Sequence, residues 1–337
     1  MLKTALFALT LHTFVVPVGL HDDLNIQSNP DKKTSPYTNG ANPSKWQKLL
    51  GTCLSIGHYK AIDACTFLID QSLISQEKTA LIQGYRAYNY MLQGHFDKSS
   101  RDFTQSLKYF PNKSQFLMGR AYSYQKLKQY HDAEVDYTTL LTLNPRDKKS
   151  YMNRAELYRE MGSYQAAIQD FSTLIRLDPE FPIAYIEQGI TYHEMGEYEK
   201  AIKVYTDALV LSKDRGRIYS KRGLSYRKKG QVKLAIQDYT KALDLMPKNA
   251  TVYNNRAWAY MTIGKLQQGL SDINHAIKLE PKSLRAATFY DTRAHILKAL
   301  GRSKDAISDF RKAFALEPLE RYKAKLKEIE QSQNQNK

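Results

Sequence analysis

Cysteine, glycine, proline and long apolar runs are all scarce in this sequence. Its 337 residues include 2 cysteines, 16 glycines and 11 prolines, and beyond residue 20 no segment is long and apolar enough to cross a membrane. Phosphate-binding glycine loops, nucleophile-elbow motifs and metal-binding His-Glu helices are absent, and the eight histidines are scattered. These absences argue against an enzyme and against a bound metal or other cofactor.

Positive charge and tyrosine, in contrast, are abundant. The chain has 50 Lys and Arg against 34 Asp and Glu, a net charge of +16, and 24 tyrosines. The positive balance favours an anionic partner or surface, or it simply keeps the protein soluble. A compact globule of this length would divide into two domains, whereas a stack of repeats escapes that size limit because each repeat packs only on its neighbours.

The N-terminal residues 1–20 have the features of an export signal. A short basic start precedes an apolar run that is short for a transmembrane helix but suits a signal peptide. An uncleaved signal anchor and a merely buried apolar segment are the alternatives. Residues 21–45 are polar and rich in Asn, Ser, Pro and Lys, which predicts a disordered linker. We therefore expect an exported protein, periplasmic or secreted, with a membrane-anchored protein as second choice.

A 34-residue repeat occupies most of the remaining chain. Repeats begin near residues 80, 114, 148, 182, 216, 250 and 287. Within most of them, position 8 is small, position 11 is tyrosine, position 20 is small, position 24 is large and apolar, and position 32 is proline. Positions 4, 8 and 11 fall on one face of a first helix, and positions 20, 24 and 27 on one face of a second. A glycine after the first helix and the proline after the second predict where each helix ends.

This pattern closely resembles the tetratricopeptide-repeat (TPR) family over residues 80–318, and the whole chain is similar to a bacterial-type exported TPR protein. The resemblance implies an all-α, right-handed TPR solenoid of antiparallel helix pairs that binds other proteins rather than catalysing a reaction. Residues 46–79 follow the same logic as a degenerate N-terminal repeat. Residues 319–337 predict a solvated C-terminal capping helix with a frayed tail, because an end repeat must hide its apolar face.

The two cysteines, Cys53 and Cys65, lie about six residues on either side of a turn near Tyr59. On antiparallel helices this spacing places them at similar height, so a disulfide is plausible, and export would favour it. The alternative is a pair of buried thiols in a reduced core. A metal site is not expected, because His58 lies in the turn and no fourth ligand has suitable spacing.

Arginine at position 7 and aspartate at position 23 occur together in six repeats. The repeat 182–215 lacks both and has Gln188 and Val204 instead. This joint loss predicts an ion pair that closes within each repeat, between its two helices. These arginines then have a structural role and do not form a nucleic-acid-binding stripe. The predicted pairs are Arg86–Asp102, Arg120–Asp136, Arg154–Asp170, Arg222–Asp238, Arg256–Asp272 and Arg293–Asp309.

The resemblance implies that positions 2, 5, 9, 12 and 13 of the first helices face a concave groove that takes a peptide or a helix. Isoleucines occupy three of these positions in the repeat 182–215, and charged residues border them. A complete clamp for chaperone tails is not expected, because no repeat has lysine at position 5 with asparagine at position 9. The alternative is that some isoleucines pack against adjoining repeats. The predicted groove residues are Tyr88, Tyr122, Met152, Arg159, Ile183, Ile186, Ile190, His193, Leu224, Arg227 and Trp258.

The alternative function is binding of an anionic partner, which could be a lipid surface, an acidic protein or nucleic acid. A basic patch at residues 215–233 and the basic C-terminal tail would carry this binding. Export would disfavour nucleic acid, and an ordinary solvated basic face is the simplest interpretation. An uncleaved N-terminal segment would also provide a route to membrane association. The sequence leaves the partner's identity and the oligomeric state open.

Overall fold

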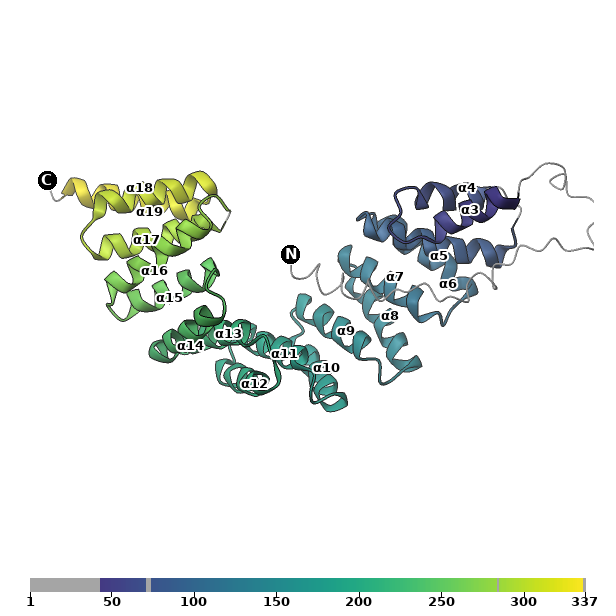
Figure 1. Cartoon of the computed structure of the whole chain (residues 1–337), viewed down its shortest axis with the longest axis horizontal. Helices are drawn as coiled ribbons and strands as arrows, with labels where there is room; N and C mark the ends of the chain where they lie inside the picture. The colour runs from purple at the N-terminus through teal and green to yellow at the C-terminus, as the bar shows by residue number, and fades with distance from the viewer. Residues whose placement is uncertain (1–42, 71–73, 284, 336–337) are drawn as a thin grey trace, which may run out of the picture. The chain divides into compact units, whose positions relative to one another are not determined.

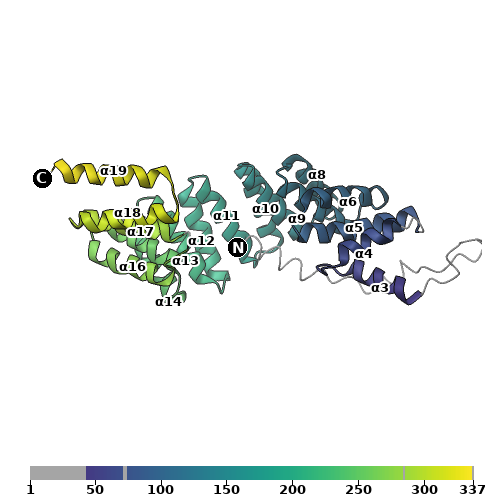
Figure 2. The ribbon, with the colours of Figure 1, turned by 90° about the horizontal axis from the view of Figure 1, so that it is seen from above.

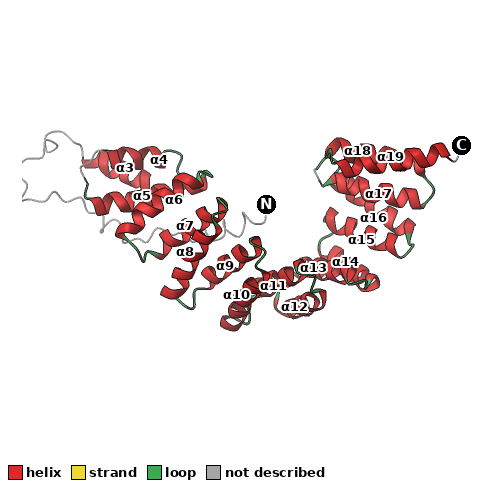
Figure 3. Ribbon diagram, turned by 180° about the vertical axis from the view of Figure 1, so that it is seen from behind, coloured by secondary structure: helices red, strands yellow, loops and turns green. Residues whose placement is uncertain are grey.

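The computed structural model describes residues 43–70, 74–283 and 285–335 (Figure 1). In these ranges every regular element is a helix, and turns join the helices (Figure 3). The helices form two compact units, the first ending at Leu143 and the second beginning at Asn144. The predicted signal segment, 1–20, and nearly all of the predicted linker lie outside the described residues. None of the described helices combines the length and the apolar character needed to span a membrane.

Three antiparallel helix pairs make the first unit. Its first helix begins at Pro43, inside the segment predicted as a linker, and proline suits the first turn of a helix because its missing N–H has no intrahelical partner there. The pairs are α3 (Pro43–Leu54) with α4 (Ala61–Asp70), α5 (Gln76–Leu92) with α6 (Phe96–Tyr109), and α7 (Ser114–Lys126) with α8 (Tyr130–Leu143).

Five helix pairs and a terminal helix make the second unit. The pairs follow the predicted 34-residue period, and each first helix packs on its own second helix; from α11 on, it also packs on the second helix of the preceding pair. They are α9 (Lys148–Glu160) with α10 (Tyr164–Leu177), α11 (Pro182–Glu194) with α12 (Tyr198–Leu211), α13 (Arg215–Lys228) with α14 (Val232–Leu245), α15 (Ala250–Thr262) with α16 (Leu266–Leu279), and α17 (Ala286–Ala299) with α18 (Ser303–Leu316), followed by α19 (Glu320–Gln335).

Close approach of the two helices of a pair depends on small residues at position 8. A Cβ atom added to Gly189 would lie 2.6 Å from the ring of Tyr205, and one added to Gly223 would lie 2.9 Å from the ring of Tyr239. Both tyrosines, at position 24, are almost fully buried in the space that the missing side chains leave. The sequence pattern of small and aromatic residues therefore describes one packing layer that recurs in each repeat.

The turn within each pair needs a left-handed residue. Seven glycines have positive φ there, among them Gly162 at 76° and Gly196 at 81°. In the repeat 114–147 the same place is taken by Lys128, with φ 60°. Its backbone N–H donates to Gln125, and the next N–H donates to Tyr124, as in the glycine turns. The repeat therefore keeps the turn geometry and accepts a side chain in a strained conformation.

In the second unit the first helices form the inner layer. In this unit α11 touches α13, α13 touches α15 and α15 touches α17, whereas consecutive second helices make no comparable contact among the described residues. Figure 2 shows the helices of this unit from above. Because the first helices are spaced more closely than the second helices, their exposed side is the inner side of this stack.

The terminal helix α19 takes the place of one more first helix. It buries Tyr322 and Ile329 completely or nearly so. Lys325 Nζ lies 2.6 Å from Asp291 Oδ1 on α17, and Glu328 Oε1 lies 2.9 Å from Lys298 Nζ on the same helix. The sequence predicts a capping helix here, and α19 covers the last pair with an apolar face as well as with ion pairs.

Candidate functional site

Six arginine–aspartate pairs tie the two helices of six repeats together. In each pair two guanidinium nitrogens lie 2.6–2.9 Å from the two carboxylate oxygens, a bidentate arrangement. The structure therefore contains every pair that the joint loss in the repeat 182–215 predicted: Arg86–Asp102, Arg120–Asp136, Arg154–Asp170, Arg222–Asp238, Arg256–Asp272 and Arg293–Asp309.

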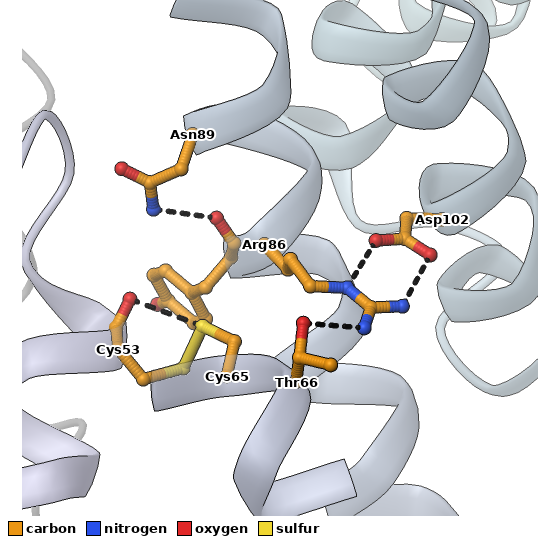
Figure 4. A network of polar contacts seen from close by, with 7 residues as sticks. Cys53, Cys65, Thr66, Arg86, Asn89 and Asp102 are labelled. Atoms are coloured by element: carbon orange, nitrogen blue, oxygen red, sulfur yellow. Dashed lines mark hydrogen bonds and ion pairs between the residues drawn. A yellow bond between two sulfur atoms is a disulfide. The ribbon is translucent and has the colours of Figure 1, made fainter. Parts of the chain in front are cut away.

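The same arginines also bond to the preceding repeat, which sequence reasoning missed. Figure 4 shows Arg86 bonded to Asp102 on one side and, through its third nitrogen, to Thr66 Oγ1 at 3.1 Å. The signal was present in the repeat, because position 25 is small and polar in six successive repeats. The corresponding bonds that join one repeat to the next are Arg120–Thr104, Arg222–Thr206, Arg256–Thr240 and Arg293–Asn274.

Two tyrosines of the same repeat flank several of these arginines. The guanidinium carbon of Arg222 lies 5.6 Å from the ring centres of both Tyr219 and Tyr226, at positions 4 and 11. Arg256 lies 5.8 Å from the rings of Tyr253 and Tyr260 in the same way. Such cation–π contacts stabilise a guanidinium that is partly removed from water. Much of the abundant tyrosine is therefore part of the scaffold.

The repeat 182–215 keeps one of these links and loses the other. Gln188 Nε2 donates to Ser172 Oγ at 2.8 Å, so the bond to the preceding repeat persists. The ion pair is missing because Val204 offers no acceptor. Gln188 is itself buried. At position 7 this repeat therefore bonds to its neighbour through a neutral hydrogen bond, and the described residues form no arginine–aspartate pair between its own two helices.

The predicted disulfide between Cys53 and Cys65 is present and fully buried (Figure 4). It joins α3 to α4. Their turn is also tied to α5, because the N–H of Gly57 donates to Asn89 Oδ1 at 2.8 Å and Asn89 Nδ2 donates to Tyr85 O at 3.0 Å. No group of three or more potential metal ligands occurs in the described part of the chain.

Three predicted groove residues lie in the core, and this corrects the prediction for them. Tyr88 and Ile186 are 2% and 6% exposed, and Met152 is also 6% exposed. The Tyr88 hydroxyl donates to Gln115 O at 2.6 Å, and Ile186 packs in a cluster with Tyr205. The cluster around Ile186 includes Ile218 of the next first helix, so this isoleucine packs against the adjoining repeat, as the alternative interpretation had it. The half-buried predicted residues are Tyr122 in the first unit and Arg159, Ile183, Ile190, His193, Leu224, Arg227 and Trp258 in the second.

Three half-buried apolar residues occupy position 9 of three successive first helices: Ile190 on α11, Leu224 on α13 and Trp258 on α15. We call this side of the three helices the inner face. Ile190 packs partly on the cluster around Tyr205, and the Trp258 ring meets His295 edge-on, with ring centres 5.8 Å apart. Each of the three residues keeps part of its apolar surface accessible.

Arg159, at one end of the inner face, already has acidic partners. Its Nη1 lies 2.7 Å from Glu187 Oε2, and its Nε lies 3.9 Å from Glu194 Oε2. Burial favours a lower pKa for Arg159, but the attraction of Glu187 and Glu194 outweighs it and raises the pKa. Arg159 therefore belongs to an internal ion pair between α9 and α11, which the sequence prediction did not foresee.

His193 and Arg227 lie in a more positive environment. His193 Nδ1 is 2.9 Å from Ser225 Oγ, and burial together with Lys221, Lys228 and Arg227 lowers the pKa of His193. Arg227 makes no ion pair with any described carboxylate, and its Nε is buried without a hydrogen-bond partner. This part of the inner face therefore carries positive charge that the described chain does not neutralise.

The basic patch at 215–233 is partly neutralised by neighbouring carboxylates. Arg217 pairs with Asp214, and Lys229 lies 3.0 Å from Glu199. In the C-terminal tail, Lys325 pairs with Asp291. The basic residues of the patch that make no ion pair with described residues are Arg215, Lys221, Arg227, Lys228 and Lys233.

Family models described as TPR repeat or tetratricopeptide repeat match residues 118–169, 155–196, 189–230, 223–264, 250–283 and 287–318, which together are more than half of the chain. This chain is a tetratricopeptide-repeat protein. A comparison with curated proteins found no match. TPR proteins are generally non-enzymatic scaffolds that bind protein or peptide partners.

Solved structures of other TPR proteins share the fold. A TPR protein from Parabacteroides merdae is 22% identical, with a TM-score of 0.60, and the match covers 76% of this chain and 99% of that one. PilW, a type IV pilus biogenesis factor, is 18% identical, with a TM-score of 0.55, covering 64% of this chain and 97% of that one. Cut9–Hcn1 of the APC/C is 16% identical, with a TM-score of 0.53, covering 85% and 54%. At these identities the likeness concerns the fold alone.

Proposed function

We propose that this TPR protein binds a peptide or helix of a protein partner on the inner face of its second unit. The observation that carries the proposal is the row formed by Ile190, Leu224 and Trp258. These residues stand at one repeat position on three adjacent helices, where the scaffold pattern requires no particular side chain. Their half-burial offers apolar area, and the unpaired cations beside them provide a charged rim.

The substitution Leu224→Asp tests this proposal, because Leu224 is half-buried on the inner face and keeps part of its side chain accessible. Leu234→Asp is the matched control: Leu234 lies in the same repeat, on the second helix α14, and is 40% exposed. Ile186 is unsuitable for such a test, since it is buried and its replacement by aspartate would disturb the fold. The wild type and both variants are used to capture partners from an extract of the native compartment, after thermal unfolding has shown that all three are folded.

The expected result is a partner that the wild type and Leu234→Asp retain and that Leu224→Asp loses. Burying a leucine side chain contributes about 2 kcal/mol, and its loss alone corresponds to a decrease of about 30-fold in affinity. A partner that Leu224→Asp retains as strongly as the control does would contradict binding on the inner face.

We propose in addition that the protein is exported. The N-terminal segment 1–20 supports this, and so does a disulfide between the only two cysteines, because disulfides persist mainly in oxidising compartments. Mass spectrometry of the protein isolated from its native cells provides the test. A chain that has lost the first 20 or so residues and has no free thiol is expected, whereas a full-length chain with two thiols in the cytosol would contradict export.

A further inference from the structure

Position 12 of the first helix is arginine in two repeats of the second unit, and the two arginines have different surroundings. Arg159 meets Glu187 and Glu194, which stand at positions 6 and 13 of the following repeat. At Arg227 the same two positions of the following repeat are Asn255 and Thr262. Neither of these carries a charge. The described part of the chain therefore supplies carboxylates to the first arginine and none to the second.

Two buried donors near this second arginine lack an acceptor. Arg227 Nε and the Tyr239 hydroxyl are both buried without a hydrogen-bond partner among the described residues. Burial raises the pKa of Tyr239 to about 12, and the positive charge and N–H groups of Arg227 oppose the rise. In the repeat 114–147 the equivalent hydroxyl, that of Tyr137, donates to Gln125 at position 12. Arginine has no lone pair to accept such a bond, so Arg227 cannot replace Gln125 as the acceptor.

The side chains around these donors are positive or apolar. Lys221 and Lys228 occupy positions 6 and 13, where Glu187 and Glu194 stand one repeat earlier. Lys221, Leu224, Arg227 and Lys228 are spaced three or four residues apart on α13, so they share one side of that helix. The result is an apolar side chain with three cations around it, and with no described carboxylate paired to any of them.

We infer that Lys221, Arg227 and Lys228 bind the carboxylate of an acidic side chain that the partner peptide carries beside an apolar residue. This inference rests on the proposed function. Within the same unit, the arginine at this repeat position in the earlier repeat, Arg159, already binds a carboxylate, that of Glu187. A guanidinium matches a carboxylate bidentately, and such charge-assisted bonds are stronger than neutral ones.

The test selects random 12-residue peptides by display on the full chain. The tightest binder is then synthesised with each Asp replaced by Asn and each Glu by Gln, one at a time. Affinities are measured for the wild type, for Arg227→Met, which keeps the apolar stem, and for Lys233→Met, a control with the same loss of charge on α14. On the wild type and on the control, one acid-to-amide change is expected to weaken binding about tenfold, as loss of a charge-assisted bond predicts. With Arg227→Met, the same acid-to-amide change is expected to weaken peptide binding less than about threefold.

A second variant supplies the missing carboxylate from within the chain. Asn255→Glu places a glutamate at the position that Glu187 holds beside Arg159, and Asn255→Gln is its uncharged control. The glutamate variant is expected to bind the acidic peptide about tenfold more weakly than the glutamine variant and to unfold at a higher temperature. A variant that folds more stably and binds less tightly cannot be explained as damaged.

The inference and the proposed function fail in different ways. In one outcome, Leu224→Asp weakens the binding of the selected peptides while their acid and amide forms bind equally well. This result would overturn the inference and leave the proposed function standing. Selection that enriches no peptide, or only peptides indifferent to Leu224→Asp, would overturn both. In another outcome, the wild type binds a labelled 20-nucleotide single strand or anionic lipid vesicles more tightly than it binds the selected peptide, and loses this binding in Arg227→Met. That result would show that the cations bind another kind of partner, and it would also overturn the inference.

Discussion

The repeats 182–215 and 216–249 each consist of 34 residues and one helix pair, but different interactions hold the two helices of each pair together. In the second of them Arg222 bonds to Asp238 within the repeat and to Thr206 of the preceding one. In the first, Gln188 keeps only the bond to the preceding repeat. The contact between repeats is thus retained where the contact within the repeat has been given up. Stacking of repeats, rather than closure of each helix pair, is the feature that this scaffold preserves.

The two repeats should differ most in the free energy of unfolding that is lost when the residue at position 7 is replaced by alanine. Arg222→Ala leaves Asp238, which is 3% exposed, without its cation, and is expected to cost about 3–5 kcal/mol. Gln188→Ala removes one neutral hydrogen bond and is expected to cost about 1 kcal/mol. Calorimetric unfolding of both variants measures the difference. In a double-mutant cycle, Asp238→Ala should cost far less in the Arg222→Ala background than alone, and full additivity would contradict the pairing.

The first helix pair, α3 with α4, offers a third way of holding two helices. It has a disulfide where the later repeats have an ion pair, and the bond closes a loop with a sequence separation of 12. Replacing both cysteines, as Cys53→Ala with Cys65→Ala, is expected to cost about 3 kcal/mol from chain entropy. Hydrogen exchange should become faster in α3 and α4 while α17 and α18 stay unchanged. Equal acceleration in both places would mean that the bond does not act locally.

The turn at Lys128 provides a smaller comparison with the glycine turns. Its φ of 60° strains a side-chain-bearing residue, and nothing in the bond pattern requires the lysine. Lys128→Gly is therefore expected to stabilise the protein by about 1 kcal/mol, and the reverse change, Gly162→Lys, to destabilise it by a similar amount. Denaturant unfolding measures both. Destabilisation by Lys128→Gly would show that the lysine side chain contributes a contact that outweighs the strain.

The smallest effect expected is the pH dependence of His193. Burial, together with Lys221, Lys228 and Arg227, lowers the pKa of His193 below its usual 6.5 or so. The unfolded chain therefore takes up this proton first as the pH falls, so the stability contribution is present above about pH 6.5 and declines below it. His193→Gln should lose less stability than the wild type between pH 7.5 and pH 5. Identical pH profiles would contradict the lowered pKa.

Much of the scaffold could be predicted because its pattern recurs at fixed positions. The period of 34, the helix pairs, the arginine–aspartate pairs and the disulfide all depend on residue types that a single helix pair brings together. The hydrogen bonds from arginine to position 25 of the preceding repeat were not predicted, although small polar residues recur at that position from repeat to repeat. Their role becomes clear only when the stacking of one repeat on the next is known.

The inner face was harder to predict, because burial there depends on the neighbouring first helix. Ile186 and Ile190 both stand at positions assigned to the groove, yet the first is buried and the second is half-buried. Arg159 and Arg227 stand at the same repeat position. The residues at positions 6 and 13 of the next repeat decide whether the arginine forms an ion pair within the described chain. Such differences depend on pairs of repeats and are not visible in the pattern of a single repeat.

The central claim is that a partner contacts the first helices of the second unit and not the second helices. Photo-crosslinking tests it most directly, with a photoreactive amino acid placed at Leu224 on α13 or at Leu234 on α14 of the same repeat. The account predicts covalent capture of the partner from position 224 and none from position 234. Capture from position 234 alone, or equally from both positions, would contradict it.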